Sequence, residues 1–204
     1  MRNKNFINKI AITGLIGSGK STVGLILTKK GINFISTDEL AKQAIIPPST
    51  GYHKLLKLMG PEYLTKDHFF DTSKIAKEAF QNGSLLKQIE DIIHPIIQDL
   101  MRKKNQELLF SGQHSVFYEV PLLFEKKWEP FFDTYVVIAI DPAKQMKHLK
   151  KNRTIDIKDI KNRMRFQMSQ EKKIKKANYV IWNNSSLTDL EKQVFSLINL
   201  IGVC

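Results

Sequence analysis

The segment that most constrains the fold of this chain is residues 14–21, with the sequence Gly-Leu-Ile-Gly-Ser-Gly-Lys-Ser. It fits the phosphate-binding pattern G-x-x-x-x-G-K-[ST], and apolar runs precede it at 10–12 and follow it at 23–27. Glycine allows successive backbone N–H groups to turn inward around a phosphate, and a following helix adds the positive end of its dipole. The segment therefore predicts a strand, a phosphate-binding loop and a helix.

Two side chains of this loop indicate what it does. Lys20 is placed to reach the β- and γ-phosphates of a nucleotide, and the Ser21 hydroxyl is placed to bind Mg²⁺. Glu119, which ends the apolar run 115–118, resembles the second acid that holds Mg²⁺ in such enzymes, although many strands end in Glu. We expect ATP to be bound by the following loop residues: Gly14, Gly17, Ser18, Gly19, Lys20, Ser21 and Thr22.

The composition excludes several classes of protein. A net charge of +12 suits a nucleic-acid partner, but only five of the 32 basic residues are Arg and the lysines are scattered. We therefore expect a solvated basic surface and no nucleic-acid partner. The single cysteine, Cys204, excludes a disulfide framework, and the sequence contains neither a signal peptide nor an apolar membrane span. These features predict a cytoplasmic protein.

The order of the expected elements is that of an α/β protein with an insertion. Apolar runs predict parallel strands at these positions: 9–13, 32–36, 115–119, 134–140 and 179–182. Between them we expect helices at 20–30, from Pro142 and at 187–201, and a short helix opening at 120–125. Asp38 follows the second strand, at the sheet edge where ligands bind in parallel sheets.

No strand signal occurs between residue 40 and about residue 111. Helical pieces are expected at 52–59, 73–81 and 84–109, and His94-Pro95 is expected to kink or divide the last of them. His94 lies in an apolar run, where a histidine is more often a packed core residue than a ligand. The pattern predicts a helical insertion of about seventy residues into the sheet domain.

A phosphate-binding loop, an acid after the second strand and an insertion favour phosphoryl transfer over a GTP switch. Asp38 is either the base that takes a proton from the acceptor hydroxyl or the ligand of a Mg²⁺-bound water, and the sequence leaves both roles open. The basic segment 147–176 contains three arginines, Arg153, Arg163 and Arg165. Its position before the last strand is typical of the lid of small-molecule kinases.

Further short motifs follow the loop in a fixed order along nearly the whole chain. They are Asp38 with Ala41, Gly51-Tyr52, Gly60, His94-Pro95, Pro121-Leu122-Leu123-Phe124-Glu125, Arg163 with Gln167, Ala177 with Val180-Ile181, and Asn183. This series resembles the dephospho-CoA kinase family. The resemblance implies a cytoplasmic enzyme that uses ATP and Mg²⁺ to phosphorylate the ribose 3′-hydroxyl of dephospho-CoA, the last step of coenzyme A synthesis.

The resemblance also implies an architecture and residue roles. It implies a five-stranded parallel sheet core at 1–38, 112–146 and 174–204, a CoA-binding helical insertion at 39–111 and a lid at 147–173. We expect a monomer with a small-molecule substrate. The implied roles are catalysis for Asp38, Lys20 and Arg163, nucleotide binding for Arg153 and Asn183, and acceptor binding for Asp38, His94, Leu122 and Glu125.

Four departures from the family pattern concern acidic or basic side chains expected at the substrates. Ser36 replaces an acid, and arginines that are usual in the family fall on Thr72, His148 and Asn152. We expect these changes to affect lid contacts and substrate affinity more than the reaction. Two alternatives remain: another kinase of this fold, acting on a nucleoside monophosphate or a sugar acid, and a non-catalytic protein that binds ATP or RNA.

Overall fold

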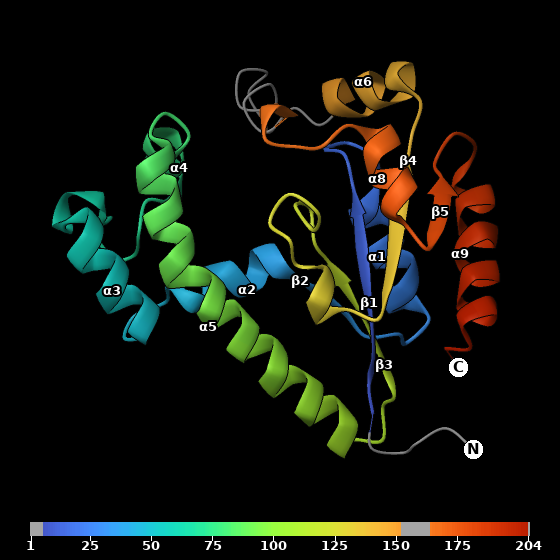
Figure 1. The fold of residues 1–204 in the computed structure, drawn as a ribbon, viewed down its shortest axis with the longest axis horizontal. Coiled ribbons are helices and arrows are strands. Elements are labelled where there is room, and N and C mark those ends of the chain that lie inside the picture. Colours follow the sequence, from blue (N-terminus) through green and yellow to red (C-terminus); the bar gives the residue numbers. More distant parts are fainter. Residues whose placement is uncertain (1–5, 152–163, 204) are drawn as a thin grey trace. The chain divides into compact units, whose positions relative to one another are not determined.

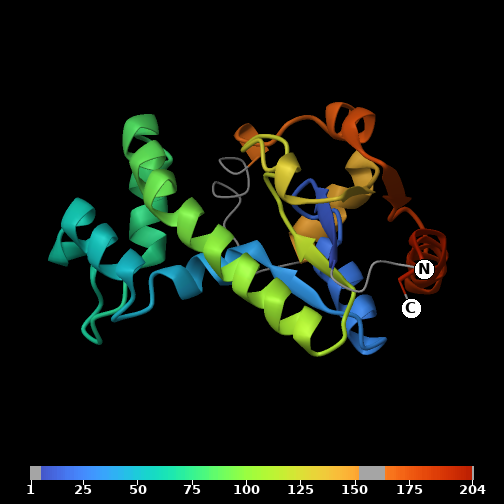
Figure 2. The same ribbon diagram turned by 60° about the horizontal axis from the view of Figure 1, so that its bottom comes forward.

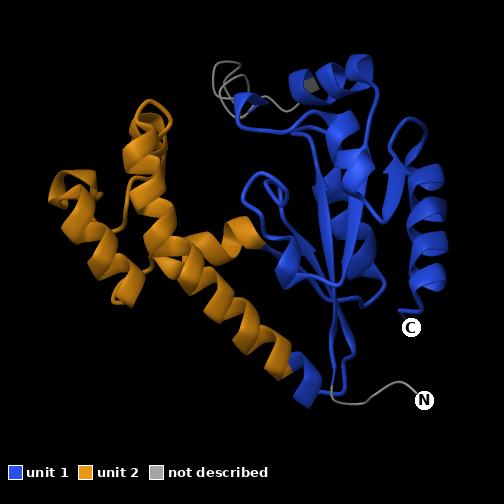
Figure 3. Cartoon of the chain, viewed as in Figure 1, with its two compact units in different colours: residues 1–36, 108–204 blue, residues 37–107 orange. Residues whose placement is uncertain are grey.

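The computed structural model describes residues 6–151 and 164–203. Its chain divides into two compact units, shown in different colours in Figure 3. The first unit comprises Met1–Ser36 and Leu108–Cys204, and the second comprises Thr37–Glu107. We refer to them as the sheet unit and the helical unit. Within the described ranges, no helix is both long enough and apolar enough to cross a membrane.

The sheet unit is built on five parallel strands in the order β2-β3-β1-β4-β5, which confirms the expected sheet (Figure 1). The strands are β1 (Asn8–Gly14), β2 (Phe34–Ser36), β3 (Ser115–Glu119), β4 (Thr134–Ala139) and β5 (Tyr179–Trp182). Ile12 of β1 lies opposite Glu119 of β3, and Glu119 in turn lies opposite Ser36 of β2. The carboxyl ends of these three neighbouring strands are therefore aligned at one edge.

Helices cover both faces of this sheet. They are α1 (Lys20–Lys29), α6 (Pro142–Lys151), α8 (Gln170–Lys176) and α9 (Leu187–Ile201), with a short 3₁₀ turn η2 (Glu129–Phe131). Ile10 and Ile12 of β1 join one apolar cluster with residues of α1 and α9, including Val23 and Val194. Because side chains alternate along a strand, Thr13 lies on the opposite face, where it contacts Lys173 of α8.

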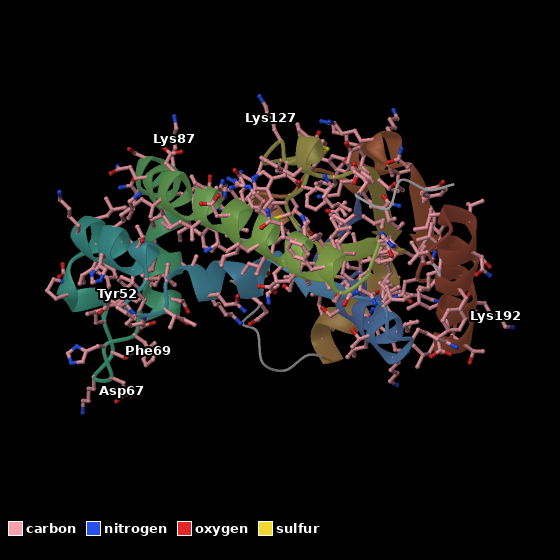
Figure 4. The ribbon with its side chains drawn as sticks, turned by 90° about the horizontal axis from the view of Figure 1, so that it is seen from below. Tyr52, Asp67, Phe69, Lys87, Lys127 and Lys192 are labelled. Carbon is pink, nitrogen blue, oxygen red and sulfur yellow. The ribbon has the colours of Figure 1, made fainter. Side chains whose placement is uncertain are left out.

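The helical unit has an apolar core of its own. Its elements are α2 (Thr37–Ala44), α3 (Thr50–Met59), the 3₁₀ turn η1 (Pro61–Tyr63), α4 (Thr72–Ala79) and α5 (Gly83–Phe110), whose last turn belongs to the sheet unit (Figure 2). Tyr52 and Phe70 pack with ring centroids 5.2 Å apart, and Leu55 is 1% exposed. Tyr52 is labelled in Figure 4, together with Phe69 on the loop before α4. Amphipathic helices thus supply this unit's stability.

His94-Pro95 is expected to kink or divide its helix, and the division does not occur, because α5 runs through Pro95 as one element. A proline removes one hydrogen bond of the helix, and the buried residues Ile89 and Ile97 on either side hold the continuous helix in place. The short helix expected at 120–125 is wrong, because residues 121–127 form turns that end at Lys127, where φ is 55°. A positive φ at a residue with a side chain is incompatible with continuing a right-handed helix.

Candidate active site

The phosphate-binding loop follows β1 and leads into α1, as the sequence predicts. Gly17 and Gly19 have φ values of 78° and 98°, in the left-handed region that glycine adopts without strain. A side chain at position 19 would also collide with the amide of Asn183. Because α1 begins at Lys20, the end of the helix that favours anions lies at the loop.

The Lys20 side chain is folded into this loop. It is only 7% exposed, and its Nζ donates to the carbonyl oxygens of Gly14 at 3.2 Å and Leu15 at 3.1 Å. The Ser18 hydroxyl is also buried, and it has no hydrogen-bond partner among the described residues. A phosphate bound in the loop would offer oxygen acceptors to both groups.

Three side-chain amides from distant parts of the chain hold the loop's backbone. Gln145 of α6 donates to the Ile16 carbonyl at 2.7 Å, and the Ile16 N–H donates to Gln167 Oε1 at 3.0 Å. Asn183, just after β5, donates to the Ser18 carbonyl at 2.9 Å. Both backbone groups of Ile16 are therefore bound by side chains, which fixes the loop conformation from outside.

These loop contacts were only partly accessible from the sequence. Asn183 is predicted at the nucleotide, and its described contact is with the loop backbone. Gln145 gave no signal, because it lies 129 residues from its partner in an ordinary polar helix. His148, one turn further along α6, is exposed and has Nδ1 3.1 Å from the Gly17 carbonyl. The departure expected at His148 therefore places an imidazole directly against the loop.

A buried ion pair lies beneath the turn segment 121–127. Lys173 of α8 is fully buried, and its Nζ lies 2.8 Å from the Glu125 carboxylate, whose side chain is 10% exposed. Glu125 also accepts a hydrogen bond from the Met168 N–H at 2.6 Å. Burial lowers the pKa of Lys173, and the bond to Glu125 opposes this effect. Sequence reasoning missed Lys173, because it stands among three other lysines at 172–176. The segment 166–176 also shows no apolar stripe that would mark this lysine as buried.

The residues expected at a metal ion offer oxygen ligands. Ser21 is exposed in the first turn of α1, and Glu119 ends β3, next to the strand that leads into the loop. In the described part of the chain, no three His, Cys, Asp or Glu side chains are grouped as a metal site. Mg²⁺ typically takes one or two protein oxygens and completes its shell with phosphates and water. The donor set fits such an ion.

The other expected site residues are divided between the two units. Asp38 is exposed in the first turn of α2, two residues after the end of β2, and His94 is half-buried on α5. Both belong to the helical unit, whereas Leu122 and Glu125 belong to the sheet unit. Arg153 and Arg163 lie outside the described residues, as does much of the expected lid.

Comparisons with known proteins agree with this geometry. The sequence matches the family described as dephospho-CoA kinase over residues 8–189. A dephospho-CoA kinase from Carboxydothermus hydrogenoformans is 33% identical over 189 residues, 93% of this chain and 92% of that protein.

Solved structures extend the similarity to the fold. A crystal structure from Thermus thermophilus has a TM-score of 0.82 at 30% identity, covering 95% of this chain and 97% of that one. The dephospho-CoA kinase from Campylobacter jejuni has a TM-score of 0.69 at 25% identity, with 96% and 98% covered. The similarity thus extends far beyond the phosphate-binding loop, over nearly the full length of each chain.

Proposed function

Because this chain belongs to the dephospho-CoA kinase family, we propose that Asp38 takes the proton from the ribose 3′-hydroxyl while Lys20 and the loop hold the transferring phosphate. The chain phosphorylates dephospho-CoA with ATP, giving coenzyme A and ADP in the final step of coenzyme A biosynthesis. Phosphoryl transfer needs little covalent chemistry from the protein, so catalysis consists of positioning and charge stabilisation. The roles of individual residues follow from that requirement.

The observation that carries the proposal is the buried Lys20 ammonium inside a loop of fixed conformation. Its two hydrogen bonds to Gly14 and Leu15 keep the charge at the position where the β- and γ-phosphates are expected. The loop itself is held by Gln145, Gln167 and Asn183, so little reorganisation is needed when a phosphate binds. Preorganised charge of this kind lowers the barrier, because no free energy is spent on reorienting the groups during the reaction itself.

We propose Mg²⁺ as the metal, bound by Ser21 and Glu119 together with the phosphates of ATP. The hydroxyl and carboxylate oxygens of these two residues support this choice, since hard oxygen ligands suit Mg²⁺. When bound, the ion neutralises charge on the β- and γ-phosphates. Ser21 and Glu119 then orient the nucleotide in the loop.

The assignment of Asp38 rests on its place in the chain. It is an exposed carboxylate in the first turn of α2, and it follows Ser36, which pairs with Glu119 at the carboxyl edge of the sheet. Ligands of open parallel sheets bind outside this edge. A carboxylate within hydrogen-bond reach of the acceptor hydroxyl accelerates the transfer by about 10²–10⁴-fold as a general base.

The substitution Asp38→Asn tests this role, because it keeps the shape and removes the basicity. We expect kcat to fall by about 10²–10⁴-fold with little change in dephospho-CoA binding. Glu39→Gln is the matched control, since Glu39 is the exposed neighbour and pairs with Lys42 on the surface. A steep rise in the Mg²⁺ concentration needed for half-maximal rate would instead assign Asp38 to a metal-bound water and refute the base.

The remaining roles are proposals on the same basis. We assign acceptor binding to the helical unit with His94 and to Leu122 and Glu125 of the sheet unit. We assign closure over ATP to the lid at 147–173 with Arg153 and Arg163. We further propose a cytoplasmic monomer without a nucleic-acid partner, which the scattered lysines support. Lys-rich surfaces bind RNA through phosphate contacts that weaken steeply with salt, so RNA binding that persists at high salt would contradict this assignment.

A further inference from the structure

We infer that Lys173 is a positioning residue for phosphoryl transfer, which fixes the phosphate-binding loop through Glu125 and Gln167. The inference rests on the kinase activity of the family and is independent of the role proposed for Asp38. Lys173 lies on α8, and its side chain is fully buried. Every contact that carries the inference lies within the sheet unit.

The ammonium of Lys173 meets three kinds of acceptor. It donates to the Glu125 carboxylate at 3.0 Å, to the Pro121 carbonyl at 3.2 Å and to the Thr13 hydroxyl at 3.4 Å. A lysine ammonium has three hydrogens to donate, so these acceptors match its capacity. Thr13 directly precedes Gly14, the first residue of the phosphate-binding loop, so one contact already reaches the start of the loop.

A second connection runs from Glu125 to the middle of the loop. The Glu125 carboxylate accepts from the Met168 N–H at 2.6 Å, which fixes the backbone next to Gln167. Gln167 Oε1 accepts from the Ile16 N–H at 3.0 Å. The Lys173–Glu125 ion pair therefore fixes the backbone next to Gln167, and Gln167 in turn binds the loop at Ile16.

Side chains at a spacing of three attach the same segment to three different elements. Gln167 binds the loop, and Lys173 binds the turn segment and β1. Between them, Gln170 binds both backbone groups of Ile140 at the end of β4, at 2.9 and 3.1 Å. The segment 167–173 thus fixes the relative positions of the loop, β4 and the turns after β3.

The energetics favour a positioning role over a stabilising one. Taking a lysine and a glutamate out of water is unfavourable, and apolar side chains of similar volume often replace buried ion pairs without loss of stability. Burial lowers the pKa of Lys173 for the same reason, because the charged ammonium is removed from water. What a methionine cannot supply is the set of directed hydrogen bonds to Glu125, Pro121 and Thr13.

The test compares Lys173→Met with Lys176→Met on the same helix. Lys176 also forms an ion pair, 2.8 Å from Glu129, and its Nζ lies over the Phe124 ring as that of Lys173 does. Its side chain, however, is 49% exposed. We expect Lys173→Met to lower kcat/KM for ATP by about 10²-fold, as small misplacements of reacting groups do. Lys176→Met should stay within about twofold, as exposed ion pairs contribute little.

The double variant Glu125→Gln/Lys173→Met separates positioning from stability. It removes the carboxylate that the single variant leaves buried without its cation, so the thermal midpoint should return toward that of the unchanged protein. We expect kcat/KM for ATP, measured at saturating dephospho-CoA so that the acceptor contact proposed for Glu125 does not enter, to stay low, because the three hydrogen bonds from Lys173 are still missing. Recovery of kcat/KM for ATP together with the thermal midpoint would overturn the inference. A Lys173→Met variant whose kcat/KM for ATP is within threefold of that of the unchanged protein would overturn it as well. If the single variant does not fold, the double variant decides alone.

Discussion

The sheet unit and the helical unit differ in the kind of contact that stabilises each of them internally. Around the phosphate-binding loop, the decisive contacts join residues far apart in the sequence, such as Asn183 with Ser18 and Gln167 with Ile16. In the helical unit, polar contacts are mostly local caps, such as Ser49 Oγ accepting from the Tyr52 N–H. Apolar packing of helices supplies the rest of that unit's stability.

This difference predicts different consequences of mutation. The sheet unit holds the phosphate with backbone groups and one lysine whose positions depend on a hydrogen-bonded network, so changes in that network should affect turnover more than stability. The helical unit depends on its apolar core, so changes in that core should affect stability and acceptor binding more than nucleotide binding. The following substitutions test the contrast.

The largest effect is expected at Lys20. Lys20→Met keeps the length of the side chain and removes the charge that neutralises the β- and γ-phosphates, a contribution of about 3 kcal/mol or more to the barrier. We expect turnover, followed by ADP release, to be abolished while circular dichroism shows an intact fold. Lys29→Met, in the last turn of the same helix, is the control. Retention of more than about a tenth of the normal rate would refute the role of Lys20.

An intermediate effect is expected in the core of the helical unit. Leu55→Ala leaves a cavity beside Tyr52 and Phe70, which should lower the free energy of unfolding by about 2–5 kcal/mol in urea titrations. The KM for dephospho-CoA should rise, and ADP affinity should not change. Leu25→Ala, at a 64% exposed site on α1, is the matched control and should change stability little. Loss of ADP affinity in Leu55→Ala would break the contrast between the units.

The smallest effect is expected at the N-terminus of α9. Ser186 accepts from the Asp189 N–H at 3.2 Å and forms a capping box with that residue. Ser186→Ala should lower the free energy of unfolding by about 1 kcal/mol, because the helix loses its cap. Since α9 packs in the apolar cluster with β1 and α1, and the three amides that hold the loop (Gln145, Gln167 and Asn183) lie outside this helix, kcat should not change. A reduced kcat in a fully folded Ser186→Ala variant would show that the conformation of the phosphate-binding loop depends on α9 as well.

The sheet and its ligand-binding loop are predictable because their signals are local. The apolar runs at 115–119 and 179–182 coincide with the observed strands β3 and β5. The G-x-x-x-x-G-K-[ST] pattern specifies a loop conformation through glycines at fixed spacing, and Gly17 and Gly19 have the positive φ that this requires. Continuous apolar runs also indicate strands buried on both faces.

The network behind the loop is not predictable in the same way. Lys173 looks like one more surface lysine, and only the folded chain brings Glu125, Pro121 and Thr13 around it. The helix expected at 120–125 is wrong for a related reason. Pro121 at a helix start is favourable locally, but tertiary contacts bind its carbonyl to Lys173 and Thr13 instead. Such contacts between distant residues leave no periodic signal in the sequence.

The most direct measurement of the central claim is an acceptor comparison with Mg²⁺ and ATP, following ADP release. The acceptors are dephospho-CoA, AMP, CMP, shikimate and gluconate. Dephospho-CoA should be preferred by orders of magnitude, because its pantetheine arm and pyrophosphate provide binding energy that the smaller acceptors lack. Faster turnover of AMP or a sugar acid would contradict the acceptor assignment, and no acceleration by any acceptor above the ATP-only rate would contradict the kinase activity itself.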